Sequence, residues 1–356
     1  IHAVNYGFGW IGSIAMARSW QVCRVLFCVL LVASINASAS DLTLMTFNVE
    51  NLFDSRHDEG KNDETYLPKA LKADPRHIAK CNKVRVKRWR DQCLFWDWNE
   101  TVVDTKLGVI ATAIKQVNQG SGPDIIAFQE VENAAILDRL RREYLDGLGY
   151  EYATLLEGND KRGIDVAFLS KYPTQNARLH AIAFSEQQKE RIGDTRPILE
   201  ATFLLPGEER VTGLNVHFPA PYHPKEMRES AYKTLNRIVS QLPEDRAIFA
   251  AGDFNTTFAE NREFAMLNRW VRPTWQVAHD LCSECPGTSF YPPKNEWSFL
   301  DMILWRPTQD WEMTSSYLAN DTTEQMTTKG TPKRFSLPAA TGVSDHWPLV
   351  LSVTTP

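Results

Sequence analysis

The sequence predicts an α/β fold, and three patterns support this prediction. Short apolar runs that end in polar side chains occur at 124–130 and 247–255, as in buried strands that carry side chains to the rim of a sheet. Apolar residues recur at helical spacing between 102 and 117. Three strand-like segments between 164 and 217 follow one another without an intervening helix, which predicts antiparallel pairing there.

The remaining elements are predicted from the same patterns. An opening strand at 42–48 alternates between apolar and polar residues and then breaks into a polar turn at Glu50 and Asn51. Residues 55–100 follow no regular period, so we interpret them as a long insertion. Strands are expected at 124–128, 164–169, 199–204, 211–217, 247–251, 299–305 and 349–353. Helices are expected at 102–117, 137–148 and 227–242.

The first 39 residues have the composition of a secretory signal peptide. Two arginines precede an apolar run at 25–35 that is too short to cross a bilayer, and small residues at 37–39 fit a cleavage site. We expect translation to start at Met16, the mature chain to start at Ser40, and the protein to be secreted or periplasmic. The alternative is that the apolar run anchors the protein in a membrane, although we expect no stable anchor.

The mature chain is acidic overall. Removing residues 1–39 takes away two arginines and no acidic residue, so the net charge moves from −5 to about −7. This balance argues against tight nonspecific binding of nucleic acid through global charge alone. It remains compatible with a nuclease that concentrates positive potential in a cleft. The length of 40–356 suits a single catalytic domain with the insertion at about 55–100.

Four cysteines remain after removal of the signal peptide, and they form two close pairs. In an exported protein, Cys81 with Cys93 and Cys282 with Cys285 are predicted to be two local disulfides. A structural zinc site is an alternative because the second pair has C-x-x-C spacing, but the wide, basic gap of the first pair disfavours it. A redox-active second pair is a further alternative that lacks the usual strand-helix setting.

Carboxylates, amides and histidines cluster in short motifs at or near the ends of the predicted strands. The motifs are Phe47-Asn-Val-Glu50, Phe128-Gln-Glu130, Gly213-Leu-Asn-Val-His217, Gly252-Asp-Phe-Asn255, Phe299-Leu-Asp301 and Ser344-Asp-His346. Oxygen ligands and a histidine from distant segments are the components of a hard-cation site that hydrolyses a phosphate ester with an activated water.

These six motifs, in this order, resemble those of the endonuclease/exonuclease/phosphatase superfamily, and the resemblance spans residues 42–353. It implies a four-layer α/β sandwich, in which two mixed β-sheets pack face to face with helices on the outside. It also implies an active site at one end of the sheets and a metal-dependent phosphoric ester hydrolase activity.

The resemblance implies four metal ligands. Glu130 is the leading ligand for Mg²⁺ or Mn²⁺, with Ca²⁺ as an alternative, because Mg²⁺ takes few protein carboxylates and keeps several waters. Asn48 would add a neutral oxygen to the same cation. Glu50 is expected to be a further ligand or to lie just behind the ligands, and Asp345 to complete the ligand shell or to hold a water.

The resemblance also implies an acid-base pair. His346 is the leading candidate for the general base, with Asp301 fixing its tautomer and raising its basicity. Asp253 is the alternative base, and the sequence does not choose between the two. His217 is expected to stabilise the phosphorane or to protonate the leaving oxygen, and Asn255 to donate to a phosphate oxygen.

Two further residues are assigned near the scissile phosphate. Arg196 resembles an arginine near the phosphate site of the family and is expected to clamp an oxygen. Asp165 is expected to orient His217 or Arg196.

Three functions compete at this point. A nuclease acting on DNA, or on RNA, is favoured because basic residues within 81–93 surround Trp89 and could follow a phosphate backbone and stack on bases. A sphingomyelinase-like or other phospholipid or small phosphoester hydrolase would instead use aromatic residues at 95–98 at a lipid headgroup surface. A non-catalytic binding protein is disfavoured by the intact set of acids and histidines. The basic segment also fits a solvated surface, and we expect a monomer.

Overall fold

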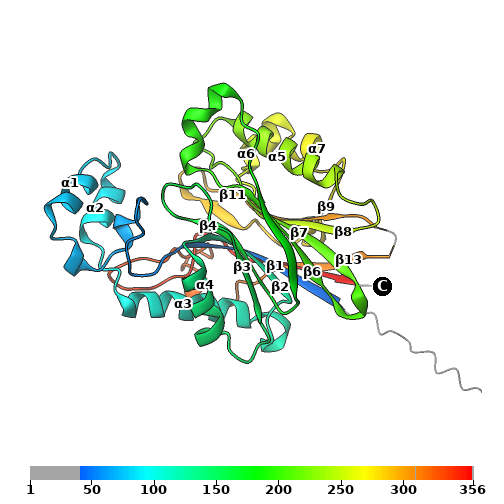
Figure 1. Cartoon of the computed structure of the whole chain (residues 1–356), viewed down its shortest axis with the longest axis horizontal. Helices are drawn as coiled ribbons and strands as arrows, with labels where there is room; N and C mark the ends of the chain where they lie inside the picture. Colours follow the sequence, from blue (N-terminus) through cyan, green and yellow to red (C-terminus); the bar gives the residue numbers. More distant parts are fainter. Residues whose placement is uncertain (1–40, 309, 355–356) are drawn as a thin grey trace, which may run out of the picture. The chain divides into compact units, whose positions relative to one another are not determined.

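Two six-stranded sheets form the centre of the computed structural model, which describes residues 41–308 and 310–354 (Figure 1). The first sheet has the order β13-β14-β1-β2-β4-β3 and the second has the order β5-β6-β7-β8-β12-β9. The expected signal segment, 1–39, and Ser40 lie outside the described residues, which all belong to one compact unit, 39–356.

Each sheet is mixed. In the first sheet β1 pairs in parallel with β2, and in the second β7 pairs in parallel with β8, whereas the other neighbouring strands are antiparallel. The strands of the first sheet are β1 (Asp41–Leu52), β2 (Ile125–Val131), β3 (Tyr152–Leu155), β4 (Asp165–Ser170), β13 (Glu312–Leu318) and β14 (Leu349–Thr354). Those of the second are β5 (Thr174–His180), β6 (Ile198–Leu204), β7 (Arg210–His217), β8 (Ala247–Asp253), β9 (Gln276–Val277) and β12 (Asp301–Arg306). A separate hairpin contains β10 (Ser289–Tyr291) and β11 (Glu296–Ser298).

Three hydrophobic cores separate four layers. Because side chains alternate along a strand, Leu44 faces the core between the two sheets whereas Met45 faces a core on the outer side. The outer core of the first sheet is covered by α3 (Glu100–Lys115) and α4 (Ala134–Arg139), and that of the second by α5 (Lys225–Ser240) and α7 (Met266–Trp270). Figure 1 shows these helices on opposite sides of the sheets, so the predicted four-layer α/β sandwich is confirmed.

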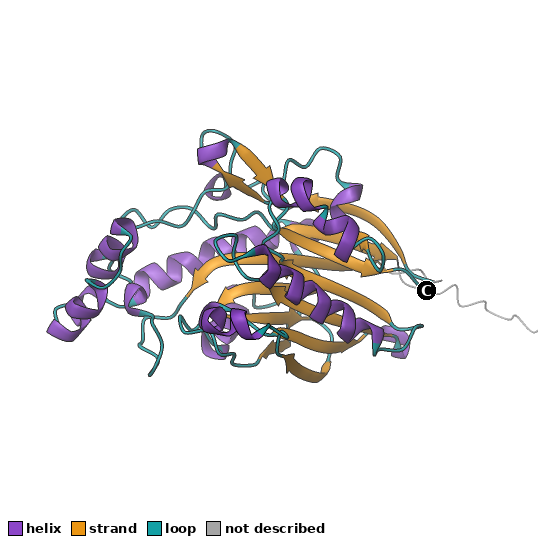
Figure 2. Ribbon diagram, turned by 90° about the horizontal axis from the view of Figure 1, so that it is seen from above, coloured by secondary structure: helices purple, strands orange, loops and turns teal. Residues whose placement is uncertain are grey.

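The insertion contains two helices that the sequence did not predict. Helices α1 (Pro75–Cys81) and α2 (Lys87–Phe95) are joined by the disulfide between Cys81 and Cys93, and we call them the α1–α2 hairpin. Both views place the hairpin at one end of the sheets (Figure 2). The second predicted disulfide, between Cys282 and Cys285, is also present. In the described part of the chain, no helix is both long and apolar enough to span a membrane.

Some predicted elements need correction. The helix expected at 137–148 is shorter and earlier, because α4 ends at Arg139 and a π-helical turn, Leu140–Tyr144, follows it. The segment expected at 164–169 forms β4 of the first sheet, whereas 199–204 and 211–217 form an antiparallel pair in the second sheet. Burial on both faces of each strand hides this division from the sequence pattern.

The core between the sheets is expected to dominate stability. The Phe168 ring lies edge-on to Phe203 and Phe249, with centroids 5.2 and 6.1 Å apart, and Phe168 is fully buried. Phe168→Ala is therefore expected to lower the free energy of unfolding by about 3–5 kcal/mol, measured by urea denaturation. Phe95→Ala, at a side chain that is exposed on α2, should change it by less than about 1 kcal/mol. Similar losses in both variants would contradict this assignment of the core.

Candidate active site

A bulge at the ends of β1 and β2 presents the first acidic side chains. Three residues of β1, 49–51, lie opposite Glu130 alone, and Glu130 is also the extra residue between β2 and β4. Glu50, Asn51 and Glu130 have φ values of 51°, 61° and 65°, a region in which a non-glycine residue is strained. Such bulges re-aim side chains, and here they bring Glu50 and Glu130 into the same pocket.

The second sheet contributes three side chains in register. His217 at the end of β7 lies beside Asp253 at the end of β8, and Asp253 lies beside Asp301 at the start of β12. The Nε2 atom of His217 lies 3.5 Å from an Asp253 oxygen and 3.8 Å from a Glu130 oxygen. The Asp253 carboxylate also accepts a 3.2 Å hydrogen bond from the Asn48 amide. The two sheets therefore meet at one polar cluster, as the sequence predicted.

His346 and Asp301 form a buried pair. Nδ1 of His346 lies 2.6 Å from Oδ2 of Asp301, and Nε2 remains 3.9 Å from the nearest Asp345 oxygen. Burial opposes the charged imidazole, but the charge and hydrogen bond of Asp301 outweigh it and raise the pKa of His346 well above its usual value. The predicted orienting role of Asp301 thus has the geometry that it requires.

The pKa values of His217 and Asp253 are shifted in opposite directions. Burial, together with the charges of Arg196, Arg162 and His346, lowers the pKa of His217 well below its usual value, so this ring is neutral at neutral pH. Burial, opposed by His346 and reinforced by Asp301, raises the pKa of Asp253 to about 7. Such a carboxyl exchanges protons near neutrality, as a general base must.

Asn255 follows β8 in a left-handed conformation, with φ of 52°. Its backbone N–H donates to Asp253 at 2.9 Å, and one N–H of its side-chain amide donates to the Phe218 carbonyl at 3.0 Å. The amide has a second N–H donor, which is the group that the predicted contact to a phosphate oxygen needs.

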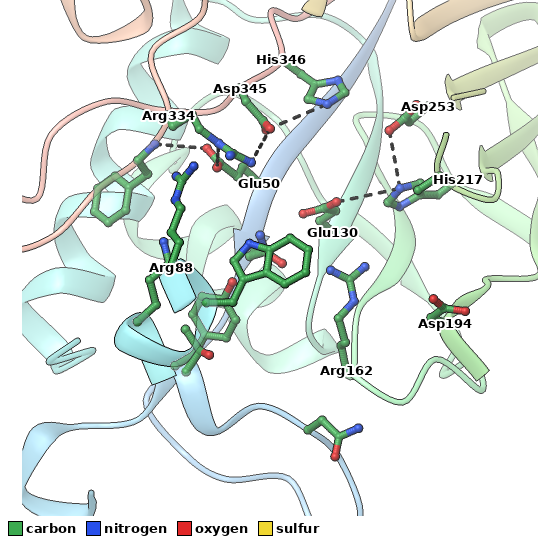
Figure 3. Close-up of a pocket in the computed structure, with 18 of the residues that line it drawn as sticks. Glu50, Arg88, Glu130, Arg162, Asp194, His217, Asp253, Arg334, Asp345 and His346 are labelled. Carbon is green, nitrogen blue, oxygen red and sulfur yellow. Dashed lines mark hydrogen bonds and ion pairs between the residues drawn. The ribbon is translucent and has the colours of Figure 1, made fainter. Parts of the chain in front are cut away.

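Arg334 is a site residue that sequence reasoning missed. Its Nε donates to Glu50 at 2.5 Å and its Nη2 donates to Asp345 at 2.6 Å, so it bridges two of the predicted metal ligands (Figure 3). Burial and the charge of Asp345, opposed by Arg334, raise the pKa of Glu50 to about 7. Arg334 lies in an irregular segment, and no sequence pattern pointed to it.

Arg196 is buried at the edge of the site, but its carboxylate partner differs from the expected one. Its Nη1 lies 3.2 Å from an Asp160 oxygen, and its Nη2 donates to the Phe218 carbonyl. Asp165 instead accepts a hydrogen bond from the backbone of Gly158, so the expectation that Asp165 orients Arg196 or His217 is corrected. Asp165 is the first residue of β4, where it pairs with Val131 beyond the bulge at Glu130, and it does not line the cavity.

One cavity of about 760 Å³ connects these groups. It is lined by the ends of the central strands, the loop with Arg162, the segments with Arg196, Tyr222 and Arg334, the segment with Asp345 and His346, and the α1–α2 hairpin with the segments on either side of it. Of the predicted site residues, Asn48 and Asp301 are not in the lining, and each contacts a residue that is. In Figure 3 the guanidinium group of Arg162 points toward Glu130.

The acidic side chains fit a hard divalent cation. Glu130, Glu50 and Asp345 supply carboxylate oxygens, and Asn48 supplies an amide oxygen that accepts from the Glu50 backbone at 3.0 Å. Burial, together with the charge of Asp345, raises the pKa of Glu50, and a bound cation would favour the ionised carboxylate. In a second group, Asp253, Asp301 and His346, the ligand-type atoms lie within 4.8 Å of one another, whereas among the described residues Glu50, Glu130 and Asp345 form no group as tight as this. Because Asp301 is hydrogen-bonded to the imidazole, we interpret that second group as a proton-transfer set.

The fold and the site together define an α/β sandwich of the hydrolase type, in which polar side chains gather at the ends of the central strands. A family model, the Endonuclease/Exonuclease/phosphatase family, matches residues 45–346, and this chain belongs to that family. Its enzymes hydrolyse phosphoric esters and are generally dependent on divalent metals. No curated protein matches the sequence.

Several solved structures share the fold. An endonuclease/exonuclease/phosphatase from Bacteroides vulgatus is 15% identical with a TM-score of 0.53, covering 89% of this chain and 100% of that one. Its counterpart from Beutenbergia cavernae is 14% identical with a TM-score of 0.53, covering 88% and 72%. D. rerio TDP2 complexed with a single strand DNA product is 12% identical with a TM-score of 0.54, covering 89% and 100%. At these identities the similarity establishes the fold alone.

Proposed function

We propose that this protein is an exported, metal-dependent phosphodiesterase that cleaves nucleic acid, with DNA as its main substrate. The observation that carries the proposal is the convergence of the His346–Asp301 pair, His217, Asp253 and Glu130 on one cavity. The DNA complex of D. rerio TDP2, a structural neighbour, supports a nucleic-acid substrate. The two disulfides support export, since such bonds persist in oxidising compartments.

The reaction is the attack of water on phosphorus, in which a P–O bond to water forms, the P–O bond to the leaving group breaks, and the leaving oxygen takes up a proton from solvent. In its neutral form, His346 accepts the proton of the attacking water, and Asp301 stabilises the imidazolium that results. Because Asp301 raises the pKa of His346 well above its usual value, this role requires a bound cation to lower that pKa. Asp253, whose pKa of about 7 also suits proton transfer, is the second candidate for this step. Glu130 and Asn48, with Glu50 and Asp345 beside them, would hold the cation. When bound, the cation would polarise the phosphoryl group and lower the pKa values of the groups around it.

His217 has a different task in this proposal. Its low pKa makes it a neutral hydrogen-bond donor, which suits stabilisation of the charge that develops on the phosphoryl oxygens. The second N–H of the Asn255 amide would donate to the same group of oxygens. Arg196 and Arg162 add positive charge at the cavity, which compensates for the acidic balance of the whole chain.

The experiment that tests this function is a turnover assay of the mature protein. Its substrates are plasmid DNA, RNA, sphingomyelin vesicles and bis(p-nitrophenyl) phosphate, each with Mg²⁺ and with EDTA. We expect metal-dependent cleavage of the nucleic acids and of the small diester. Cleavage of sphingomyelin without cleavage of either nucleic acid would replace the proposal with a lipid phosphodiesterase.

A further inference from the structure

The α1–α2 hairpin directs one face of α2 into the active-site cavity. Arg88, Trp89, Gln92 and Trp96 line the cavity, and their spacing places them on adjoining positions of one helix face. Lys87 does not line it and instead pairs with Asp91 at 2.5 Å on the exposed side of the helix. Of the basic residues in this segment, the structure therefore selects Arg88 for contact with a ligand.

The hairpin is held in place by contacts with the rest of the site. Lys80 of α1 donates to the Lys61 carbonyl at 3.2 Å. Lys61 in turn pairs with Glu157 at 2.9 Å and donates to the Asp160 carbonyl, in the loop that carries Arg162. Trp98, just after it, is buried and donates to the Phe53 carbonyl at 3.2 Å. Because the hairpin is held in place before a ligand binds, its side chains can contact the ligand without the entropy cost of ordering a loop.

Two exposed aromatic rings lie on the lining of this cavity. Trp89 is 56% exposed and Tyr222 is 68% exposed, which is unusual for side chains of this size. One face of the Tyr222 ring packs on His223, with centroids 4.3 Å apart, and its hydroxyl donates to Asp194 at 2.6 Å. The exposed surface of both rings is therefore available for stacking.

Arginines accompany both rings. Among the described residues, Arg88 forms no ion pair, and the nearest carboxylate to Arg162 is that of Asp160 at 3.8 Å from Nε. Both arginines line the cavity, where their positive charge can attract phosphates. Figure 3 shows Arg88 below Glu50 and Arg162 below Glu130, on separate elements.

We infer that the α2 face is a subsite for an unpaired nucleotide next to the scissile phosphate, with Trp89 stacking on its base and Arg88 contacting its phosphate. Tyr222 stacks on a second base, on the side of the cavity that Arg162 lines. A duplex keeps the faces of its bases stacked inside, so exposed rings favour single-stranded nucleic acid. This inference rests on the proposed nucleic-acid substrate and adds the strand state that the site prefers.

The first test measures binding, independently of turnover. The full mature protein is titrated, in EDTA, into a fluorescein-labelled single-stranded oligonucleotide and into its duplex, and anisotropy is recorded. Trp89→Ala should weaken single-strand binding by about 5- to 150-fold, the factor that corresponds to loss of one stacked base, and Trp89→Phe should restore most of it. Phe95→Ala, on the same helix outside the cavity, is the matched control and should leave binding unchanged.

The salt dependence of binding tests Arg88. Arg88→Gln should reduce the slope of log K against log[salt] by about 0.7, the value for one phosphate contact on a single strand. Lys87→Gln, which removes a charge from the neighbouring position outside the cavity, should change the slope less. Equal changes in the two variants would overturn the assignment of Arg88.

Turnover separates failure of this inference from failure of the proposed function. Trp89→Ala should raise KM for the single-stranded oligonucleotide and leave the hydrolysis of bis(p-nitrophenyl) phosphate nearly unchanged. Unchanged single-strand binding and KM, or tighter binding of the duplex than of the single strand, would overturn the subsite while the phosphodiesterase stands. Absence of metal-dependent hydrolysis of every substrate, with the binding differences intact, would overturn the proposed function alone. Loss of sphingomyelin hydrolysis in Trp89→Ala, with unchanged binding of oligonucleotides, would make the α2 face a lipid-binding surface.

Discussion

His346→Ala and His217→Ala are each expected to lower turnover on plasmid DNA by about two to four orders of magnitude, the usual contribution of a positioned proton-transfer or charge-stabilising group. His346→Ala removes the proton acceptor that Asp301 orients through a 2.6 Å contact. His217→Ala removes the neutral hydrogen-bond donor near Asp253 and Glu130. The measurement is kcat and KM at saturating Mg²⁺.

The double variant distinguishes cooperating groups from independent ones. If both histidines serve one transition state, the loss in the double variant should be smaller than the product of the two single losses. His180→Ala is the control and should retain turnover, because His180 of β5 pairs with Glu200 of β6 and does not line the cavity. Near-normal turnover in either single active-site variant would remove that histidine from the proposed mechanism.

Chelation is expected to abolish activity, and Glu130→Gln is expected to weaken the response to metal strongly. The substitution keeps the shape of the side chain at the bulge and removes the anionic oxygen that Mg²⁺ prefers. Loss of a direct ligand should raise the half-saturating Mg²⁺ concentration by more than the about 10- to 100-fold that is typical for loss of a group behind a ligand. Metal titrations of turnover, after treatment with EDTA and dialysis, measure this concentration.

Glu132→Gln is the matched control for this prediction. Glu132 lies two residues further along the chain, is buried, and accepts a hydrogen bond from the Asp54 backbone, which a glutamine oxygen also accepts. It does not line the cavity, so its metal response should be normal. Full hydrolysis by metal-free protein, or equal effects of the two substitutions, would rule out Glu130 as the principal ligand.

The sequence alone predicted the longer buried strands and the polar motifs near their ends, whereas it missed the short or more exposed strands β3, β5, β9, β10, β11 and β13. The apolar runs of β2 and β8 record burial on both faces, and a short window of sequence contains this pattern. The alternation in β1 predicted a strand, although its polar residues Thr43 and Thr46 are buried too. The close spacing of each cysteine pair, together with the expected export of the protein, predicted both disulfides. The local sequence pattern likewise placed Glu130, His217 and Asp253 at strand ends.

Only the tertiary structure decided which of these groups meet and what each one contacts. Arg334 reaches Glu50 across 284 residues of sequence, and Asp160 rather than Asp165 pairs with Arg196. Such pairings depend on how two sheets and their loops pack, and charged residues in loops leave no periodic pattern. The orientation of α2, which turns Arg88 inward and Lys87 outward, is fixed in the same way by packing of the insertion against the site.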